Sequence, residues 1–154
     1  MKNRDIAFLA LTTFALLMAN PAAASDKDAV AAVVKQYTQA FNNNDRKALS
    51  SSCTDNAVVI DDFAPHLWQG ANACGNWWND FAATAKKQGI VNGMLTLGDA
   101  WHLYVTGDRA YAVYPARFTY KMNGKPVAEQ GVWTFALQKL AAGWRIAGWG
   151  WALH

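Results

Sequence analysis

The second half of the chain is a series of short segments in which apolar and polar side chains alternate. This period of two is typical of β-strands, and it recurs over 94–97, 101–106, 110–122, 127–139 and 144–153. Asn123-Gly124, between two of these segments, favours a two-residue hairpin turn. The pattern therefore predicts consecutive strands that pair mainly as an antiparallel meander.

The first half reads differently. Apolar residues recur at helical spacing over 30–41 and 73–87, and a short helix is expected over 46–51. One early strand is expected over 57–60. Helices that are segregated from strands in this way predict an α+β fold, with the helices on one face of a curved antiparallel sheet.

The N-terminus has the features of a secretory signal peptide. Lys2 and Arg4 precede an uncharged apolar run over 6–19, and the small residues Ala22 and Ala24 fit a cleavage site. An uncleaved anchor is the alternative, although the run is shorter than the roughly 20 apolar residues of a membrane span. We expect residues 1–24 to be a cleaved signal peptide, residues 25–154 to form one domain in the periplasm or outside the cell, and no membrane contact after cleavage.

Charge and motifs narrow the possible partners. The formal net charge of the whole chain is +3 and no basic run is present, so we expect no binding to nucleic acid. The sequence has no glycine-rich phosphate loop, and its histidines and cysteines lack the spacing of a metal site. We therefore expect neither a cofactor nor a metal.

The two cysteines are compatible with a disulfide. An oxidising compartment would permit a bond between Cys53 and Cys74. Two buried free thiols are the alternative, because the sequence does not show whether the Cα atoms come close enough.

Three motifs, in their order along the chain, resemble a known family. They are Tyr37-x-x-Ala40-Phe41 with Asn44-Asp45, then 57–62 followed by Trp68-x-Gly70, and Gly143-Trp-Arg-Ile on the last strand. Together they resemble SnoaL-like proteins of the nuclear transport factor two-like superfamily, which includes ketosteroid isomerase. The resemblance implies a cone-shaped barrel with an internal pocket, and a homodimer formed through the outer sheet face.

The isomerase suggests roles for particular residues. Its oxyanion-stabilising tyrosine and its aspartate base match Tyr37 and Asp61, which implies proton abstraction next to a carbonyl. The isomerase also has a protonated acid on a later strand. Here that strand carries Gly131, Trp133 and Phe135, and the nearest carboxylate is Glu129.

Each candidate catalytic residue also has a structural interpretation. Asp61 could cap the loop after its strand, and Tyr37 lies on the apolar stripe of its helix, which favours a core position. His102 could face the cavity as a proton carrier or oxyanion donor, or be satisfied structurally. Arg117 and Glu129 are expected to form an ion pair across the hairpin.

The domain is rich in tryptophan, which indicates an aromatic-lined cavity or interface as well as a core. We predict that Trp68, Trp101, Trp133 and Phe135 contact a ligand, with simple core packing as the alternative. Three hypotheses follow for the function: a pocket that binds a small apolar or aromatic molecule without catalysis, an isomerase, cyclase or dehydratase with Asp61 as general base, and a structural dimeric module.

Overall fold

A computed structural model describes residues 25–154, so the predicted signal peptide lies outside the described residues. The order of elements is α1 (Asp26–Asn42), α2 (Arg46–Ser51), β1 (Cys53–Ile60), β2 (Leu67–Gln69), α3 (Ala73–Gln88), β3 (Ile90–Leu97), β4 (His102–Thr106), β5 (Arg109–Met122), β6 (Lys125–Leu140) and β7 (Gly143–Leu153). No helix among these residues is long and apolar enough to cross a membrane.

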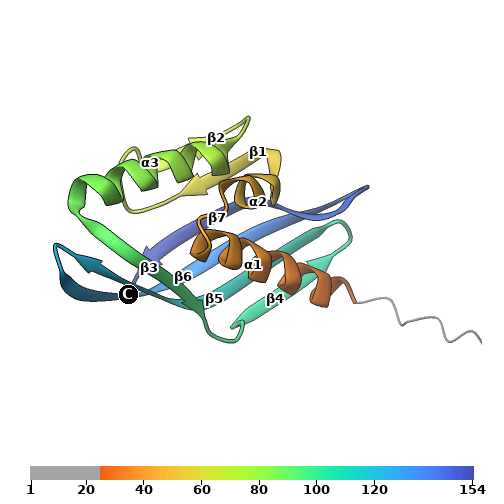
Figure 1. Cartoon of the computed structure of the whole chain (residues 1–154). Coiled ribbons are helices and arrows are strands. Elements are labelled where there is room, and N and C mark those ends of the chain that lie inside the picture. Colours follow the sequence, from red (N-terminus) through yellow and green to blue (C-terminus); the bar gives the residue numbers. More distant parts are fainter. Residues whose placement is uncertain (1–24) are drawn as a thin grey trace, which may run out of the picture.

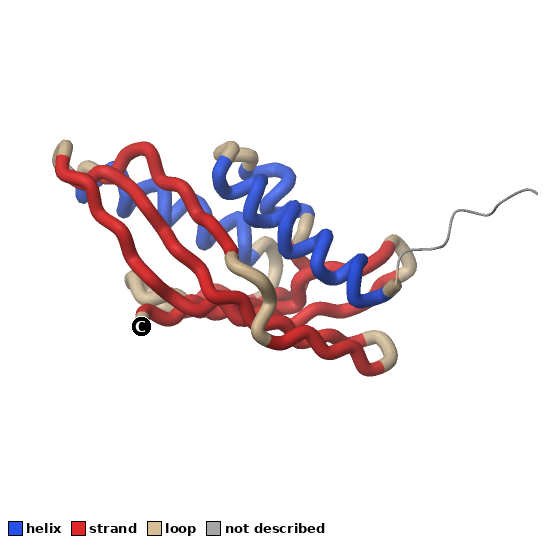
Figure 2. The backbone as a smooth tube through the Cα atoms, turned by 90° about the horizontal axis from the view of Figure 1, so that it is seen from below, coloured by secondary structure: helices blue, strands red, loops and turns tan. Residues whose placement is uncertain are grey.

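The strands form one curved sheet that covers one side of the three helices (Figures 1 and 2). The strand order is β2-β1-β7-β6-β5-β3, and β4 also pairs with β5. The predicted α+β class and curved sheet are confirmed, but the sheet is mixed, because β1 and β7 run parallel. A parallel pair needs a long crossover, and here most of the chain separates the two strands, so local turn signals could not indicate it.

Helix α1 begins with a capping box and packs on the concave face of the sheet. The Ser25 hydroxyl accepts a hydrogen bond from the Asp28 backbone N–H, and the Asp28 carboxylate accepts from the Ser25 backbone N–H. Val30, Val34 and Tyr37 recur on one side of the helix and are fully buried. The helix therefore contributes a continuous apolar stripe to the core.

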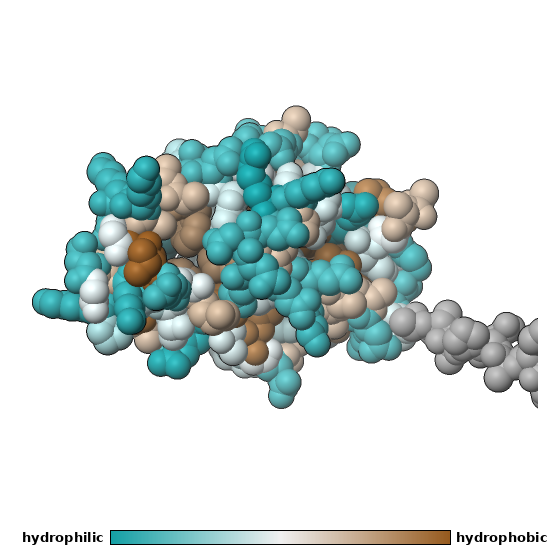
Figure 3. Space-filling view, viewed as in Figure 1, coloured by the Kyte–Doolittle hydropathy of each residue, from teal (hydrophilic) through white to brown (hydrophobic). Residues whose placement is uncertain are grey.

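Two further contacts fix the helices to the sheet. The Asn42 side chain bonds both the backbone N–H and the C=O of Leu95, at 2.8 and 2.9 Å, which joins the end of α1 to β3. The structure joins Cys53, at the start of β1, to Cys74 in the first turn of α3 by a disulfide, with the Cα atoms 6.5 Å apart. Polar residues dominate the face seen in Figure 3, with apolar groups in separate patches.

Candidate functional site

A cavity of about 300 Å³ lies between α3, the end of α1 and the inner face of the sheet. Its wall is mainly aromatic: Phe41, Phe63, Trp77, Phe81, Phe118, Tyr120, Trp133, Trp149 and Trp151. Three carboxylates, Asp61, Asp62 and Glu129, complete its polar part with Thr84 and Gln88. The aromatic residues therefore surround an open volume instead of filling it.

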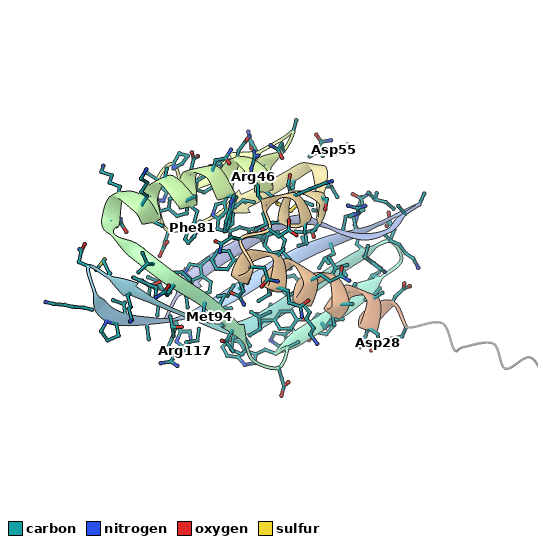
Figure 4. All side chains as sticks on the ribbon, viewed as in Figure 1. Asp28, Arg46, Asp55, Phe81, Met94 and Arg117 are labelled. Carbon is teal, nitrogen blue, oxygen red and sulfur yellow. A yellow bond between two sulfur atoms is a disulfide. The ribbon has the colours of Figure 1, made fainter. Side chains whose placement is uncertain are left out.

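Helix α3 supplies one wall because of its spacing. Trp77, Phe81, Thr84 and Gln88 follow one another at intervals of three or four residues, and Ala85 is four residues after Phe81. All five therefore share the side of the helix that faces the cavity. Figure 4 shows Phe81 below α3, pointing toward the sheet. The apolar spacing over 73–87 predicts a helix but does not by itself indicate a cavity wall.

Asp61 comes directly after β1 and lies at the cavity wall. Ala57 and Val59 of β1 are buried, and the same alternation turns Asp61 inward, whereas its neighbour Asp62 is exposed. One carboxylate oxygen of Asp61 accepts a hydrogen bond from the indole N–H of Trp77 at 2.7 Å, and the other accepts from the backbone N–H of Asp62 at 2.8 Å. Asp61 thus lines the cavity and also accepts a hydrogen bond within its own loop.

The surroundings of Asp61 alter its acidity. Burial raises the pKa of Asp61 to about 6, although the hydrogen bonds from Trp77 and from the Asp62 backbone act in the opposite direction. A carboxyl group with this pKa can change its protonation state near neutral pH. The arrangement is chemically suited to accepting or returning a proton at the cavity wall.

Tyr37 does not line the cavity. It is fully buried under the sheet, and its hydroxyl oxygen accepts a 2.8 Å hydrogen bond from the indole N–H of Trp149. Burial raises the pKa of Tyr37 far above its usual value. The core position favoured by the helix stripe is the one that the structure has, and the expected role of Tyr37 as an oxyanion donor in the cavity needs correction.

His102 is on the opposite side of the sheet from the cavity. On β4, Leu103 and Val105 pack against the core, so alternation turns His102 and Tyr104 outward. The two rings stack with centroids 5.8 Å apart, and the Tyr104 hydroxyl lies 3.2 Å from the His102 Nδ1. The expectation that His102 faces the cavity beside Asp61 is therefore wrong.

Of the four predicted ligand contacts, only Trp133 lines the cavity. It is 2% exposed, and within residues 25–154 its indole nitrogen has no hydrogen-bond partner. Trp68 lies behind the wall, where its N–H donates to Asp80 at 2.8 Å. Phe135 is two residues deeper on β6 and packs against Tyr37, so it belongs to the core.

Trp101 also lies away from the cavity. It precedes β4, and its side chain is 54% exposed. The placements of Trp68, Trp101 and Phe135 correct the prediction that these residues contact a ligand, because an aromatic side chain in the sequence does not reveal which side of a wall it occupies.

A polar pair that is not among the sequence predictions also lines the cavity. The Tyr120 hydroxyl donates a 2.6 Å hydrogen bond to Glu129, and both residues line the wall. Burial raises the pKa of Tyr120 to about 12, and the hydrogen bond to Glu129 acts in the same direction. The pair presents a phenol and a carboxylate to the same volume as Asp61.

The register of the hairpin explains why this pair was missed. With Met122 opposite Lys125, Glu129 stands opposite Phe118, and Arg117 stands opposite Gln130. The expected ion pair between Arg117 and Glu129 is therefore wrong by one residue, which places the two side chains on different faces. Figure 4 shows Arg117 projecting from β5 away from the helices.

No metal centre is evident in the described part of the chain, residues 25–154: it contains no group of three or more histidine, cysteine, aspartate or glutamate side chains that could hold a metal ion.

Comparison with solved structures places the fold. The chain resembles a nuclear transport factor 2-like superfamily protein from Salmonella enterica serovar Typhimurium, with a TM-score of 0.71, 17% identity, and 84% of this chain and 91% of that chain covered. A ketosteroid isomerase-like protein from Erwinia carotovora atroseptica gives a TM-score of 0.68 and 17% identity, covering 84% and 96%. At these identities, the likeness shows the fold alone.

A third similar structure is a nuclear transport factor 2-like protein with a cystatin-like fold from Novosphingobium aromaticivorans, with a TM-score of 0.68, 20% identity, and 83% and 81% of the two chains covered. No curated protein sequence matches the chain. A family model described as SnoaL-like domain matches residues 30–150, which is most of the chain. The protein therefore belongs to the SnoaL-like domain family of the nuclear transport factor 2-like fold.

Proposed function

We propose that this protein binds a small apolar or aromatic molecule in the cavity beneath α3. The observation that carries the proposal is the cavity itself, about 300 Å³ of unfilled volume with an aromatic wall. Binding pockets for small molecules begin at roughly this size and are mostly apolar, with a few polar groups that orient the ligand. A purely structural module would instead be expected to fill the volume with its tryptophans.

The export of the protein is part of the same proposal. The predicted signal peptide and the disulfide between Cys53 and Cys74 both support an oxidising compartment. We therefore place the binding activity in the periplasm or outside the cell.

Native mass spectrometry of the protein purified after export tests the binding. We expect a bound small molecule in the wild type, and its loss in Ala85→Trp, because residue 85 lines the cavity and a tryptophan would occupy it. Ala82→Trp is the matched control, since Ala82 is exposed on the same helix outside the cavity lining. A wild type without a bound molecule, or an adduct that survives Ala85→Trp, would contradict the proposal.

A second candidate function is proton transfer by Asp61 during isomerisation, cyclisation or dehydration of the bound molecule. It is favoured by the position of this carboxylate at the cavity wall and by its pKa of about 6. The Tyr120 hydroxyl, which lines the same wall, donates to Glu129. Asp61→Asn should then abolish turnover and leave the binding of the substrate intact; full turnover in this variant would exclude Asp61 as the base.

A further inference from the structure

The charges around the cavity are all of one sign. Asp61, Asp62 and Glu129 line it, and no lysine, arginine or histidine of residues 25–154 does so. The salt bridges found in this part of the chain join Asp108 to Arg109 and Asp26 to Lys139, so none involves a cavity carboxylate. The protein therefore provides negative charge at the cavity without a cation to balance it.

Two of these carboxylates act as hydrogen-bond acceptors in the cavity wall. Asp61 accepts from two N–H groups, and Glu129 accepts from the Tyr120 hydroxyl. Asp62 is exposed, so water can solvate its charge.

The three carboxylates come from separate elements of the fold but line the same cavity. Asp61 and Asp62 follow β1, whereas Glu129 lies on β6 opposite Phe118 of β5. Tyr120 donates to Glu129 and lines the same wall as Asp61 and Asp62, so the three carboxylates border one volume. The negative potential therefore extends across the cavity instead of being confined to one loop.

The aromatic wall supplies a second kind of attraction for a cation. Faces of tryptophan, tyrosine and phenylalanine attract quaternary and protonated amines, most strongly where water is excluded. Trp77 and Trp149 meet edge to face in this wall, with centroids 4.8 Å apart and an angle of 87° between the rings. Two rings at a right angle can contact a bound cation from two directions.

We propose that the ligand of this cavity is an organic cation, with a quaternary or protonated amine attached to an apolar or aromatic body. The proposal rests on the proposed binding function and specifies its ligand class. The carboxylates would balance the charge of the ligand, while the rings would contact the alkyl groups around its nitrogen. A neutral molecule of the same shape would leave the carboxylates without a counter-charge.

Choline and its uncharged carbon isostere, 3,3-dimethylbutan-1-ol, test the charge separately from the shape. We expect choline to change the tryptophan fluorescence of the purified protein saturably and to bind about tenfold more tightly than the isostere, within the range that cation–π contacts and a nearby carboxylate provide. Glu129→Gln should weaken choline binding several-fold and leave the isostere unaffected. Asp55→Asn, which removes an exposed carboxylate of β1 outside the cavity lining, should change neither affinity.

The possible results separate the two proposals. Equal affinity for choline and the isostere, or an equal loss of choline binding in Glu129→Gln and Asp55→Asn, would overturn the cationic ligand class and leave cavity binding in place. Binding of neither probe, together with an empty wild-type protein in native mass spectrometry, would overturn both.

Discussion

The indole N–H of Trp77 donates a 2.7 Å hydrogen bond to the carboxylate of Asp61 across the cavity wall. This contact joins α3 to the residue that follows β1, and it brings a carboxylate and an aromatic ring of the cavity wall together. The hydrogen bond lowers the pKa of Asp61, whereas burial raises it, because a donor stabilises the ionised carboxylate. The acidity of Asp61 therefore depends on a residue 16 positions further along the chain.

Trp77→Phe should raise the pKa of Asp61 above its present value of about 6, since the variant keeps an aromatic wall and removes the donor. Carbon-13 NMR titration of the aspartate carboxyl groups measures this pKa directly. Trp78→Phe is the control, because Trp78 is the adjacent tryptophan of α3 and does not line the cavity. An unchanged titration of Asp61 in Trp77→Phe would show that the hydrogen bond has no influence on its acidity.

Asp61 should also give the stability of the protein a characteristic pH dependence. Its pKa is about 6 in the folded protein, against 3.8 for a free aspartate side chain in water, so the folded state holds the proton more tightly. The contribution of Asp61 to the free energy of unfolding is therefore fully present below pH 4. It is lost as the pH rises from about 4 to about 6, which lowers the free energy of unfolding by about 2–3 kcal/mol. Asp61→Asn does not titrate, so its free energy of unfolding should improve relative to the wild type by this amount between pH 4 and pH 7.5.

Urea denaturation at the two pH values measures that relative change. Asp55→Asn, at an exposed position of the preceding strand, should show a constant difference from the wild type over the same range. If the difference between Asp61→Asn and the wild type is also constant, the carboxyl group has an ordinary pKa and is not desolvated.

The sequence leaves the pocket and loop-capping interpretations of Asp61 both open. The buried Ala57 and Val59 alternate with exposed residues on β1, and the continuation of this alternation turns Asp61 inward.

The sequence predicts the long hairpin of β5 and β6 correctly, because Asn123-Gly124 defines a two-residue turn between them. The turn also predicts the Tyr120–Glu129 pair. Counting outward from Met122 and Lys125 places Glu129 opposite Phe118, and Tyr120 is two residues from Phe118 on the same face of the sheet. The turn signal is therefore enough to define the register of Glu129, from which the predicted pairing with Arg117 differs by one residue.

Other features depend on contacts that no local pattern records. A proline inside a strand is typical of an edge or a bulge, yet β5 pairs with β6 through Pro115, opposite Val132. Pro115 falls between the residues of β5 that pair with β4 and those that pair with β3, so its missing N–H removes no bond from either ladder. Which tryptophans surround the cavity is likewise decided by how the sheet curls, and Trp68 and Trp101 had the same local pattern as any strand or loop aromatic.

Tyr37→Phe tests the structural role given to this tyrosine. The variant would leave the buried N–H of Trp149 without its acceptor, so we expect a loss of about 1–3 kcal/mol in the free energy of unfolding. Tyr111→Phe, at an exposed position of β5, should stay within about 0.5 kcal/mol of the wild type. Ligand affinity should be unchanged in Tyr111→Phe, as measured by titration of the folded variants. In Tyr37→Phe a change in affinity would act through Trp149, which lines the cavity and loses its acceptor. A free energy of unfolding equal to that of the wild type in Tyr37→Phe would contradict the structural role.

Removal of the disulfide should weaken the connection between β1 and α3. The bond between Cys53 and Cys74 closes a loop with a sequence separation of 21 residues, for which chain entropy gives a stabilisation of about 3 kcal/mol. The double variant Cys53→Ala, Cys74→Ala should therefore unfold at a lower urea concentration than the exported wild type, with a similar dependence on urea. Dithiothreitol should lower the midpoint of the wild type and leave the double variant unaffected. If the wild type is insensitive to dithiothreitol and iodoacetamide labels both cysteines without prior reduction, the two residues are free thiols, and the disulfide no longer supports export.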